Sequence, residues 1–465
     1  MAAVNIDSTI NNMRSNIVTE IILPADSTVW LGTGLGVSVI RDSLTVETLP
    51  SSAELIEGSP DTLLPEGGIS AMAASGQGRV MLIAVAGSEN DIPVGKGIAY
   101  TTNATDSVIG WEYFNQPIDK QAVNILDTAE WGGEGGVLFF SALPITVPQA
   151  NVTYDIALSD EFAWIASWAG GLRRYNLSDK SWERVPVPMD DQFELTTCAD
   201  TSYKHNDDGD LVLKDFYYNP RDPIDGGNHN HKTFSVLVYG DTIWVGTANG
   251  INRGIIDADG FDCIDWEHYS YPTDGLSGNF VVSLALQMHK GKRVIWAATV
   301  NADDPTEQRG VSYTTNDGLS WNTALLGERV YNITAHDSLV FAATANGLWK
   351  TEDGINWARY KPAQQHIPYS TDEILANEVY SVAFDTGDTS IWIGTGDGVA
   401  HSYDLDGQNW KIFRAEYDQD EDYAYPNPFS PYTHNVIGGD GYVRFHTNEW
   451  SNTPVIELEV YNFAM

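Results

Sequence analysis

Short apolar runs recur along the chain, and a glycine-containing turn follows most of them. The clearest unit lies near residue 390. Val379–Asp385 alternates between apolar and polar residues, Ser390–Thr395 is mostly apolar, and two further short segments follow after Gly/Asp turns. Alternation predicts a strand with one buried face, and an apolar run predicts a strand packed on both faces. The unit therefore predicts four short antiparallel strands joined by hairpins.

The same unit recurs along the chain. Its second strand starts near an aromatic or apolar residue in seven copies, at Trp30, Leu82, Trp164, Trp244, Trp296, Phe341 and Trp392. Copies without insertions lie 45 to 52 residues apart. Four-stranded units at this spacing cannot bury their faces alone and are typical of β-propeller blades. We therefore expect an all-β, seven-bladed β-propeller over residues 18–415, with essentially no helix.

The first copy, WLGTGLGVSVI, carries Gly32, Gly34 and Gly36 and could be taken for a phosphate-binding turn. A dinucleotide fingerprint requires G-x-G-x-x-G at the start of a helix. Here a β-branched run follows the glycines, and the motif occurs in every copy. The glycines therefore predict a hairpin in which they adopt positive φ or allow close backbone approach.

A second motif closes several units, as TTNDGLSW (residues 314–321), KTEDGINW (350–357) and the looser YDLDGQNW (403–410). These segments resemble the Asp-box, which in its families joins the third and fourth strands of a blade on the face opposite the functional one. Asn316 and Glu352 stand where the family usually has Asp. The resemblance therefore implies structural turns rather than a catalytic site, formed by Asp317, Gly318, Trp321, Asp353, Gly354, Trp357, Asp406, Gly407 and Trp410.

Two further resemblances concern larger parts of the chain. TDGLSGNFVVSLALQ before VIWAAT, and RSNIVTEIIL before TVWLGT, resemble the extracellular sensor propellers of two-component regulators. This likeness covers residues 18 to about 415, after a lead-in of residues 1–17. YPNPF at Tyr425–Phe429 resembles the C-terminal sorting domain of type IX secretion cargo. It implies a bacterial, extracellular or cell-surface protein that meets the secretion machinery through a truncated immunoglobulin-like β domain, residues 425–465, behind an acidic linker, 416–424. The alternative is a simple linker and an ordinary small domain.

Charge excludes some partners. The chain has 25 Lys and Arg against 64 Asp and Glu, for a formal charge of -39. Such a surface repels phosphate backbones and anionic lipid, so we expect no nucleic acid. No apolar run reaches the roughly 18 residues of a membrane span. Cys198 and Cys263 either pair or remain two thiols, and the sequence leaves this open.

Catalytic motifs are absent from the sequence: there is no G-x-S-x-G, no H-E-x-x-H and no P-loop. Metal ligands are more plausible in the oxygen-rich segments HNDDGD and DADGFD, which make calcium a candidate cofactor at Asp207, Asp208, Asp210, Asp257 and Asp259. The other reading of these segments is a solvated turn. NHNH places His229 and His231 as candidate zinc ligands.

Four long departures from the repeat indicate where function lies: residues 87–97, 114–152, 186–232 and 300–310. The first and last join second to third strands and the other two join blades, so all four should lie on one face of a propeller. Long ordered loops are often functional, although these loops could instead plug the axial channel. We expect the ligand-binding face to include Trp131, Phe193, Tyr203, Phe216, Tyr217, Tyr218, His229 and His231.

The sequence thus favours a secreted or surface binding protein without catalytic activity, for protein or glycan ligands. One alternative is a glycan-cleaving Asp-box hydrolase, for which the 64 acidic residues offer no basis for choosing a catalytic pair. Another is the detached sensor propeller of a signalling receptor.

Overall fold

The computed structural model describes the propeller region with short gaps. The described residues are 13–24, 28–42, 45–75, 78–120, 127–132, 138–256, 263–365, 373–415 and parts of 423–446.

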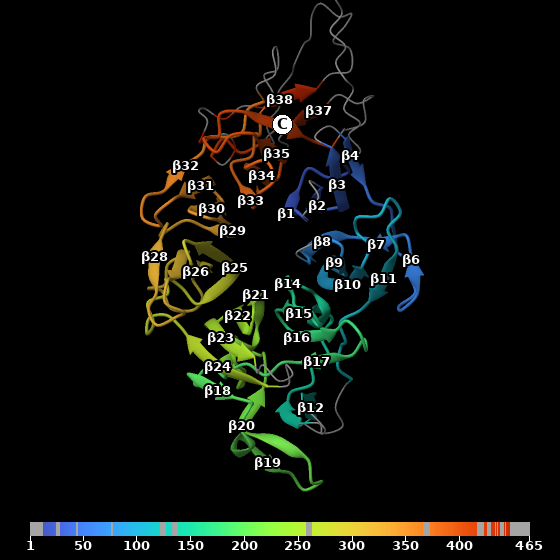
Figure 1. Cartoon of the computed structure of the whole chain (residues 1–465), viewed down its shortest axis with the longest axis vertical. Coiled ribbons are helices and arrows are strands. Elements are labelled where there is room, and N and C mark those ends of the chain that lie inside the picture. The colour runs from blue at the N-terminus through green and yellow to red at the C-terminus, as the bar shows by residue number, and fades with distance from the viewer. Residues whose placement is uncertain are drawn as a thin grey trace, which may run out of the picture.

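Seven four-stranded antiparallel arrays surround a central axis in the described residues (Figure 1). Blades 1 to 3 comprise β1 (Val18–Ile22), β2 (Val29–Thr33), β3 (Gly36–Asp42), β4 (Thr45–Thr48); β8 (Gly68–Ala74), β9 (Met81–Glu89), β10 (Ile92–Thr101), β11 (Trp111–Phe114); and β14 (Asp155–Leu158), β15 (Phe162–Ser167), β16 (Gly171–Asn176), β17 (Trp182–Arg184). Blades 4 and 5 comprise β21 (Thr233–Tyr239), β22 (Thr242–Thr247), β23 (Gly250–Ile256), β24 (Ile264–Tyr269); and β25 (Phe280–His289), β26 (Lys292–Val300), β27 (Gly310–Thr314), β28 (Asn322–Ala324). Blades 6 and 7 comprise β29 (Val330–His336), β30 (Leu339–Thr344), β31 (Gly347–Thr351), β32 (Ala358–Arg359); and β33 (Val379–Asp385), β34 (Ser390–Thr395), β35 (Gly398–Ser402), β36 (Trp410–Phe413).

Minor elements decorate this ring. β6 (Pro60–Asp61) extends blade 2, β18 (Glu194–Thr196) extends blade 4, and β5 (Ser51–Ser52) pairs with β7 (Leu64–Pro65). Helical structure in the described residues is limited to four 3-10 segments, η1 (Pro148–Asn151), η2 (Asp200–Ser202), η3 (Pro223–Asp225) and η4 (His229–His231).

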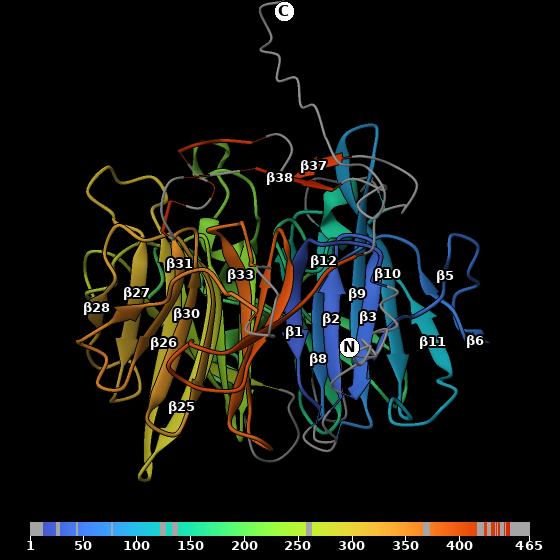
Figure 2. The ribbon, with the colours of Figure 1, turned by 90° about the horizontal axis from the view of Figure 1, so that it is seen from above.

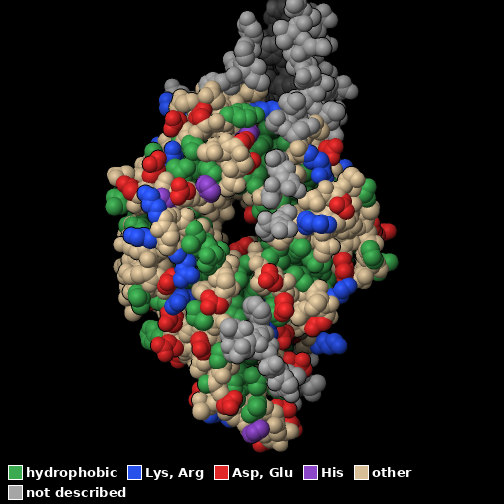
Figure 3. Space-filling model, viewed as in Figure 1, with side chains coloured by type: hydrophobic (Ala, Val, Ile, Leu, Met, Phe, Trp, Pro, Cys, Tyr) green, Lys and Arg blue, Asp and Glu red, His purple; other side chains and the backbone are tan. Residues whose placement is uncertain are grey.

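The innermost strands close the ring. β1, β8, β14, β21, β25, β29 and β33 contact one another in that order, and β33 contacts β1. Residues from the two ends of the propeller also meet, since Asn16 accepts the backbone N–H of Gly398 through its carbonyl (2.7 Å) and that of Ala415 through its side chain (2.7 Å). Figure 3 shows the opening of the axial channel at the centre of one face. The predicted all-β class and propeller architecture are confirmed.

The glycines of the first repeat belong to a hairpin, as predicted. β2 and β3 pair in continuous register from Val29 opposite Ile40 to Thr33 opposite Gly36. Gly36 has a φ of 109°, which a residue with a Cβ adopts only at a cost. A Cβ on Gly32 would lie 2.8 Å from the Cβ of Glu20, so the second strand approaches the innermost strand closely here.

The three Asp-box-like segments lie in the turns between the third and fourth strands of blades 5, 6 and 7. In blade 6 the Asp353 carboxylate accepts the backbone N–H groups of Ile355 (2.8 Å) and Asn356 (2.7 Å). These bonds hold the pKa of Asp353 well below its usual range, and the bond from the Asn356 N–H has the largest effect. The carboxylate therefore organises its own turn, which is the structural role expected for it.

Two inter-blade links combine into a separate sheet. β12 (Asp127–Trp131) and β13 (Leu138–Ala142) come from the first link, and β19 (Tyr203–His205) and β20 (Leu211–Tyr218) come from the second. The order is β12-β13-β20-β19, with β13 and β20 parallel. This insertion sheet projects from the rim below blades 3 and 4 in Figure 1.

The insertion sheet is fixed to both neighbouring blades. The Arg174 guanidinium of blade 3 lies 4.6 Å from the ring centroid of Trp131 and 4.5 Å from that of Phe162, which is cation–π geometry. On the other side, a disulfide joins Cys198 to Cys263, just before β24 of blade 4. The pairing that the sequence left open is thus present in the structure.

The tail contributes only a small sheet to the described residues, in which β37 (Tyr423–Tyr425) pairs with β38 (Arg444–His446). Most of the predicted linker and sorting-like domain lies outside the described residues. No part of this sheet belongs to the seven blades. The immunoglobulin-like domain and its boundaries stay a prediction.

Candidate ligand-binding site

The four long departures contact one another in series. Asn151, at the end of the first link, accepts the backbone N–H of Gly95 in the β9–β10 hairpin (2.9 Å). The two links share the insertion sheet, and His229 of the second link lies 3.4 Å from Asp303 in the β26–β27 loop. Figure 2 shows the β9–β10 hairpin rising on the side of the ring opposite the tip of the β25–β26 hairpin. These contacts agree with the expectation of one loop-bearing face, whereas the insertion sheet itself lies at the rim and does not plug the channel.

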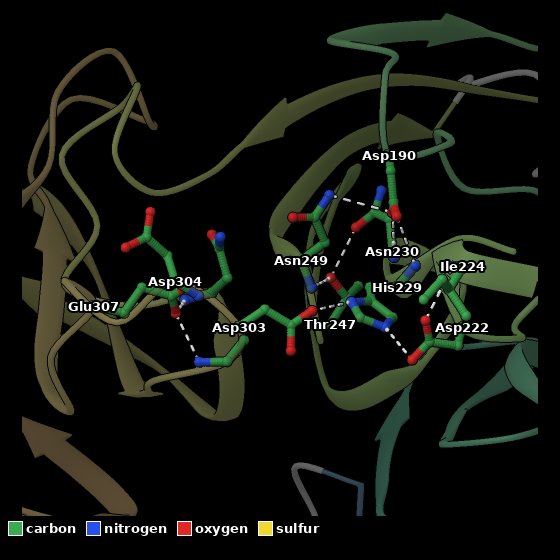
Figure 4. Close-up of polar contacts among 12 residues, drawn as sticks. Asp190, Asp222, Ile224, His229, Asn230, Thr247, Asn249, Asp303, Asp304 and Glu307 are labelled. Carbon is green, nitrogen blue, oxygen red and sulfur yellow. Dashed lines mark hydrogen bonds and ion pairs between the residues drawn. The ribbon is translucent and has the colours of Figure 1, made fainter.

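A polar network holds the second link in place on this face (Figure 4). The Asp190 carboxylate accepts the backbone N–H groups of His229 (2.9 Å) and Asn230 (2.7 Å) and a side-chain N–H of Asn249 (3.2 Å). The His229 ring lies between Asp222 (3.7 Å) and Asp303 (3.4 Å). His229 therefore connects two loops that are about 75 residues apart in the sequence.

The β26–β27 loop has its own internal acceptor. The Glu307 carboxylate accepts the backbone N–H groups of Ala302 (2.7 Å), Asp304 (3.2 Å) and Asn279 (2.8 Å). Asn279 directly precedes Phe280, the first residue of β25. These hydrogen bonds therefore order the β26–β27 loop and connect it to the start of β25, beside the mouth of the channel.

The mouth of the channel is shaped by β-bulges at equivalent places in the blades. Strand pairing skips one residue near the start of six innermost strands. A bulge bends the strand and re-aims the side chain of the unpaired residue. The skipped residues are Thr19, Ser70, Phe234, Val282, Tyr331 and Tyr380.

Blades 3 to 5 supply an aromatic pocket at this level. A cavity of about 490 Å³ is lined by Tyr154, Trp168, Phe234, Phe280 and Val282. The Tyr154 and Phe234 rings meet at 75° with centroids 5.4 Å apart, and Phe234 and Phe280 are 4.1 Å apart. Tyr154 is 41% exposed and Trp168 is 39% exposed. A ligand can therefore reach aromatic surface that the fold leaves uncovered.

Blades 6 and 7 present a more polar edge. The Tyr331 and Tyr380 rings lie 5.4 Å apart, and their hydroxyls donate to the two oxygens of Glu378 (3.1 and 2.9 Å). Burial, followed by the Glu378 carboxylate, raises the pKa of both tyrosines. Both phenols therefore remain protonated donors at neutral pH.

Two carboxyl groups follow the mouth residues along the innermost strands. Glu20 comes directly after Thr19, and Asp155 comes directly after Tyr154. Asp155 accepts the backbone N–H groups of Val236 (2.9 Å) and Ile156 (2.8 Å). Burial raises the pKa of Asp155 to about 7 despite these bonds, and burial together with Asp155 raises that of Glu20 to about 8. The channel beneath the mouth therefore disfavours negative charge that has no cationic partner.

Most of the aromatic residues expected on the binding face are in the core. Trp131, Tyr203, Phe216 and Tyr218 are buried in one hydrophobic cluster with blades 3 and 4. They are buried because the two links pack against each other and against the blades, so they do not form an exposed face. Tyr217 is partly buried, and Phe193 is 64% exposed and directly precedes β18 of blade 4.

The two histidines lie in different environments. His231 is fully buried, and its Nδ1 accepts the backbone N–H of Asn219 (2.9 Å). Its Nε2 lies 3.2 Å from the Val187 carbonyl oxygen. Burial lowers the pKa of His231 to about 3. Both ring nitrogens are thus used by the backbone, and only His229 faces other loops.

The candidate calcium segment HNDDGD forms the β19–β20 turn. Its Asn206 side chain accepts the backbone N–H groups of Asp208 (3.1 Å) and Asp210 (2.8 Å), which is an Asx-type turn. Asp207 lies in the same turn, whereas Asp257 and Asp259 lie outside the described residues. Among the described residues no three His, Cys, Asp or Glu side chains form a group suited to a metal ion. Calcium stays a prediction.

The mouth residues were missed although the sequence carries a signal for them. Tyr154, Phe234 and Tyr331 each stand ten positions before the second-strand aromatic of their repeat, namely Trp164, Trp244 and Phe341. Aligning the repeats by that second-strand residue would have shown an aromatic residue at this position in three of the seven copies.

Comparisons with known proteins assign no family to the chain. No family model matches the chain, and no curated protein matches it. No described helix is long and apolar enough to cross a membrane. Solved structures with a similar arrangement include the extracellular domain of a putative one-component system from B. thetaiotaomicron (15% identity, TM-score 0.48, covering 85% of this chain and 39% of that one). Others are the β-propeller domain of Cps50 (Swd1) from Myceliophteria thermophila (13% identity, TM-score 0.46, covering 84% and 98%) and the computationally designed protein Ika8 (12%, TM-score 0.39, covering 88% of each). The match thus spans about two fifths of the first of these proteins.

Proposed function

We propose that this chain is a secreted or cell-surface binding protein without catalytic activity, which holds a protein or glycan ligand at the mouth of its axial channel. The observation that carries the proposal is the aromatic pocket of blades 3 to 5, in which Trp168 and Tyr154 remain exposed beside Phe234. Concave sites with aromatic walls and a few polar groups are typical of ligand binding. The hydrogen-bonded loops around the pocket favour a preformed site.

Two features support a location outside the cell. The Cys198–Cys263 disulfide is stable in oxidising compartments. The resemblance of Tyr425–Phe429 to type IX sorting domains supplies a route of export, with the secretion machinery as a second partner. The sequence of the complete gene tests this part, because an upstream signal peptide and a completed sandwich are required.

Binding is tested with the purified full chain on a glycan array and against extracellular proteins. We expect Trp168→Ala to abolish or strongly weaken binding of the ligand that the wild type retains. Tyr239→Ala is the matched control, since it removes another exposed aromatic side chain at the end of β21 far from Phe234. Equal ligand binding by wild type and Trp168→Ala would contradict the proposed site.

The glycoside hydrolase alternative has its own measurement. If the chain cleaves a glycan and Asp155→Asn or Glu20→Gln abolishes cleavage, the channel carboxyls are catalytic and the binding proposal is replaced. Retention of the uncleaved glycan by both variants and by wild type supports binding alone.

A further inference from the structure

The walls of the pocket suit a positively charged group. Trp168, Tyr154, Phe234 and Phe280 contribute aromatic surface on one side of the mouth. An ammonium group over an aromatic face is attracted by the negative centre of the ring, most strongly for Trp. Phe234 and Phe280 belong to adjacent innermost strands, and Tyr154 directly precedes a third. The blades therefore fix how these rings are arranged.

A carboxyl group lies next to the pocket, outside the residues that line it. Asp155 follows Tyr154 in the chain, and its carboxylate accepts the N–H of Val236, two residues beyond Phe234. Glu20 is close enough to Asp155 for the two charges to interact. Among the described residues, neither carboxyl group forms an ion pair with Lys, Arg or His.

The surrounding molecule has the same sign. The chain carries a formal charge of -39, which attracts cations to a channel with protein walls. Both residues keep some exposed surface. Burial of their carboxyl groups raises both pKa values, so their negative charge develops only as pH rises towards 8.

We propose that the aromatic pocket binds an alkylammonium group, with its carbon substituents against Trp168 and Phe234 and its charge attracted by the neighbouring Asp155 carboxylate. This inference rests on the proposed function and names the chemistry of the ligand at the same site. A phosphate or carboxylate ligand would be repelled by the neighbouring carboxylates once they are ionised. A neutral apolar ligand would fit the walls and gain no attraction from these carboxylates.

The test uses the full chain and titration calorimetry at pH 8.5. Choline is the probe, and its uncharged isostere, in which carbon replaces the ammonium nitrogen, is the matched control ligand. We expect choline to bind at least about tenfold more tightly than the isostere, because only choline gains the cation–π and carboxylate interactions. Trp168→Ala and Asp155→Asn should each weaken choline binding by about tenfold, and Tyr239→Ala should leave it unchanged. Thermal unfolding of each variant shows whether the fold is retained.

Two sources of the ammonium group are separated with peptides. A peptide with one trimethyllysine, the same peptide with unmodified lysine and the same peptide with norleucine are titrated in parallel. Binding of either charged peptide above norleucine assigns the pocket to a protein ligand, and binding of choline alone assigns it to a small molecule. Equal affinity for choline and its isostere, or no binding of any cationic probe, overturns the inference. Either result leaves the proposed function standing if Trp168→Ala still loses the ligand found on the arrays.

Discussion

The indole ring of Trp321 meets that of Trp244 edge to face, with centroids 6.1 Å apart and planes at 83°. Trp321 ends the Asp-box-like turn of blade 5, whereas Trp244 lies in the second strand of blade 4. Trp357 with Trp296 and Trp111 with Trp30 repeat this contact across two other seams, at 85° and 80°. The turn motif therefore packs neighbouring blades together.

Removing one of these indoles should destabilise the ring. We expect Trp321→Ala to lower the free energy of unfolding by about 3 kcal/mol, because a large buried side chain leaves a cavity at the seam. Leu319→Ala in the same turn is the control, since Leu319 is 84% exposed. Urea denaturation followed by fluorescence measures both. Equal midpoints for the two variants would show that the seam does not depend on the indole.

The disulfide should contribute measurably to stability. It closes a segment of 65 residues between the second link and blade 4. We expect the double variant Cys198→Ser, Cys263→Ser to lose about 2–4 kcal/mol of unfolding free energy. Guanidinium denaturation with and without reductant is the measurement. Reductant should lower the midpoint of the wild type and leave that of the double variant unchanged.

Stability should fall as pH rises through the neutral range. The pKa of Glu20 is raised in the folded state to about 8 from 4.5. The proton on Glu20 therefore stabilises the fold below pH 4.5, and this contribution is lost progressively as pH rises towards 8. We expect Glu20→Gln to reduce the loss between pH 5 and pH 8.5 by at least about 1.4 kcal/mol, the equivalent of one pKa unit. Glu54→Gln, at an exposed site, is the control. Parallel pH profiles for wild type and Glu20→Gln would contradict the assignment.

Ligand binding should show the opposite pH dependence. Because Asp155 and Glu20 ionise only near pH 7 and 8, the negative charge next to the pocket develops in this range. We expect choline affinity to increase between pH 6 and pH 9 in the wild type. In the variant Asp155→Asn, Glu20→Gln the affinity should be low and independent of pH. Calorimetry at the two pH values distinguishes these results.

The His229 contacts should control one loop rather than the whole fold. His229 lies between Asp222 and Asp303, and such partly exposed pairs contribute up to about 1 kcal/mol. We expect His229→Asn to change the unfolding midpoint little but to accelerate amide exchange in residues 301–309. His205→Asn, in the exposed β19–β20 turn, should leave this exchange unchanged. Unaltered exchange in His229→Asn would mean that Glu307 alone orders the loop.

The ring was predictable because each blade consists of consecutive residues, so the repeat from Trp30 to Trp392 contains the whole pattern. The insertion sheet was not predictable in this way. Its central pairing joins Leu138 to Leu211 in parallel, across residues that belong to blade 3. Aromatic residues in a link look alike whether they pack or face solvent, so Trp131 and Tyr218 were expected at the surface although they are buried. The mouth was missed for a different reason, since one bulge per strand changes the direction of a single side chain such as Tyr380.

The contacts of Asn16 with Gly398 and Ala415 have a consequence for how the molecule is assembled. Within the described residues no blade borrows a strand from the opposite end of the chain, so the junction between blades 7 and 1 is of the same kind as the other junctions. A circularly permuted chain that starts in the short link after β28 and joins residue 415 to residue 13 through a flexible linker should therefore build the same ring. A permuted chain that starts within residues 186–232 should not, because the two links that share β13 and β20 would then be divided between its ends.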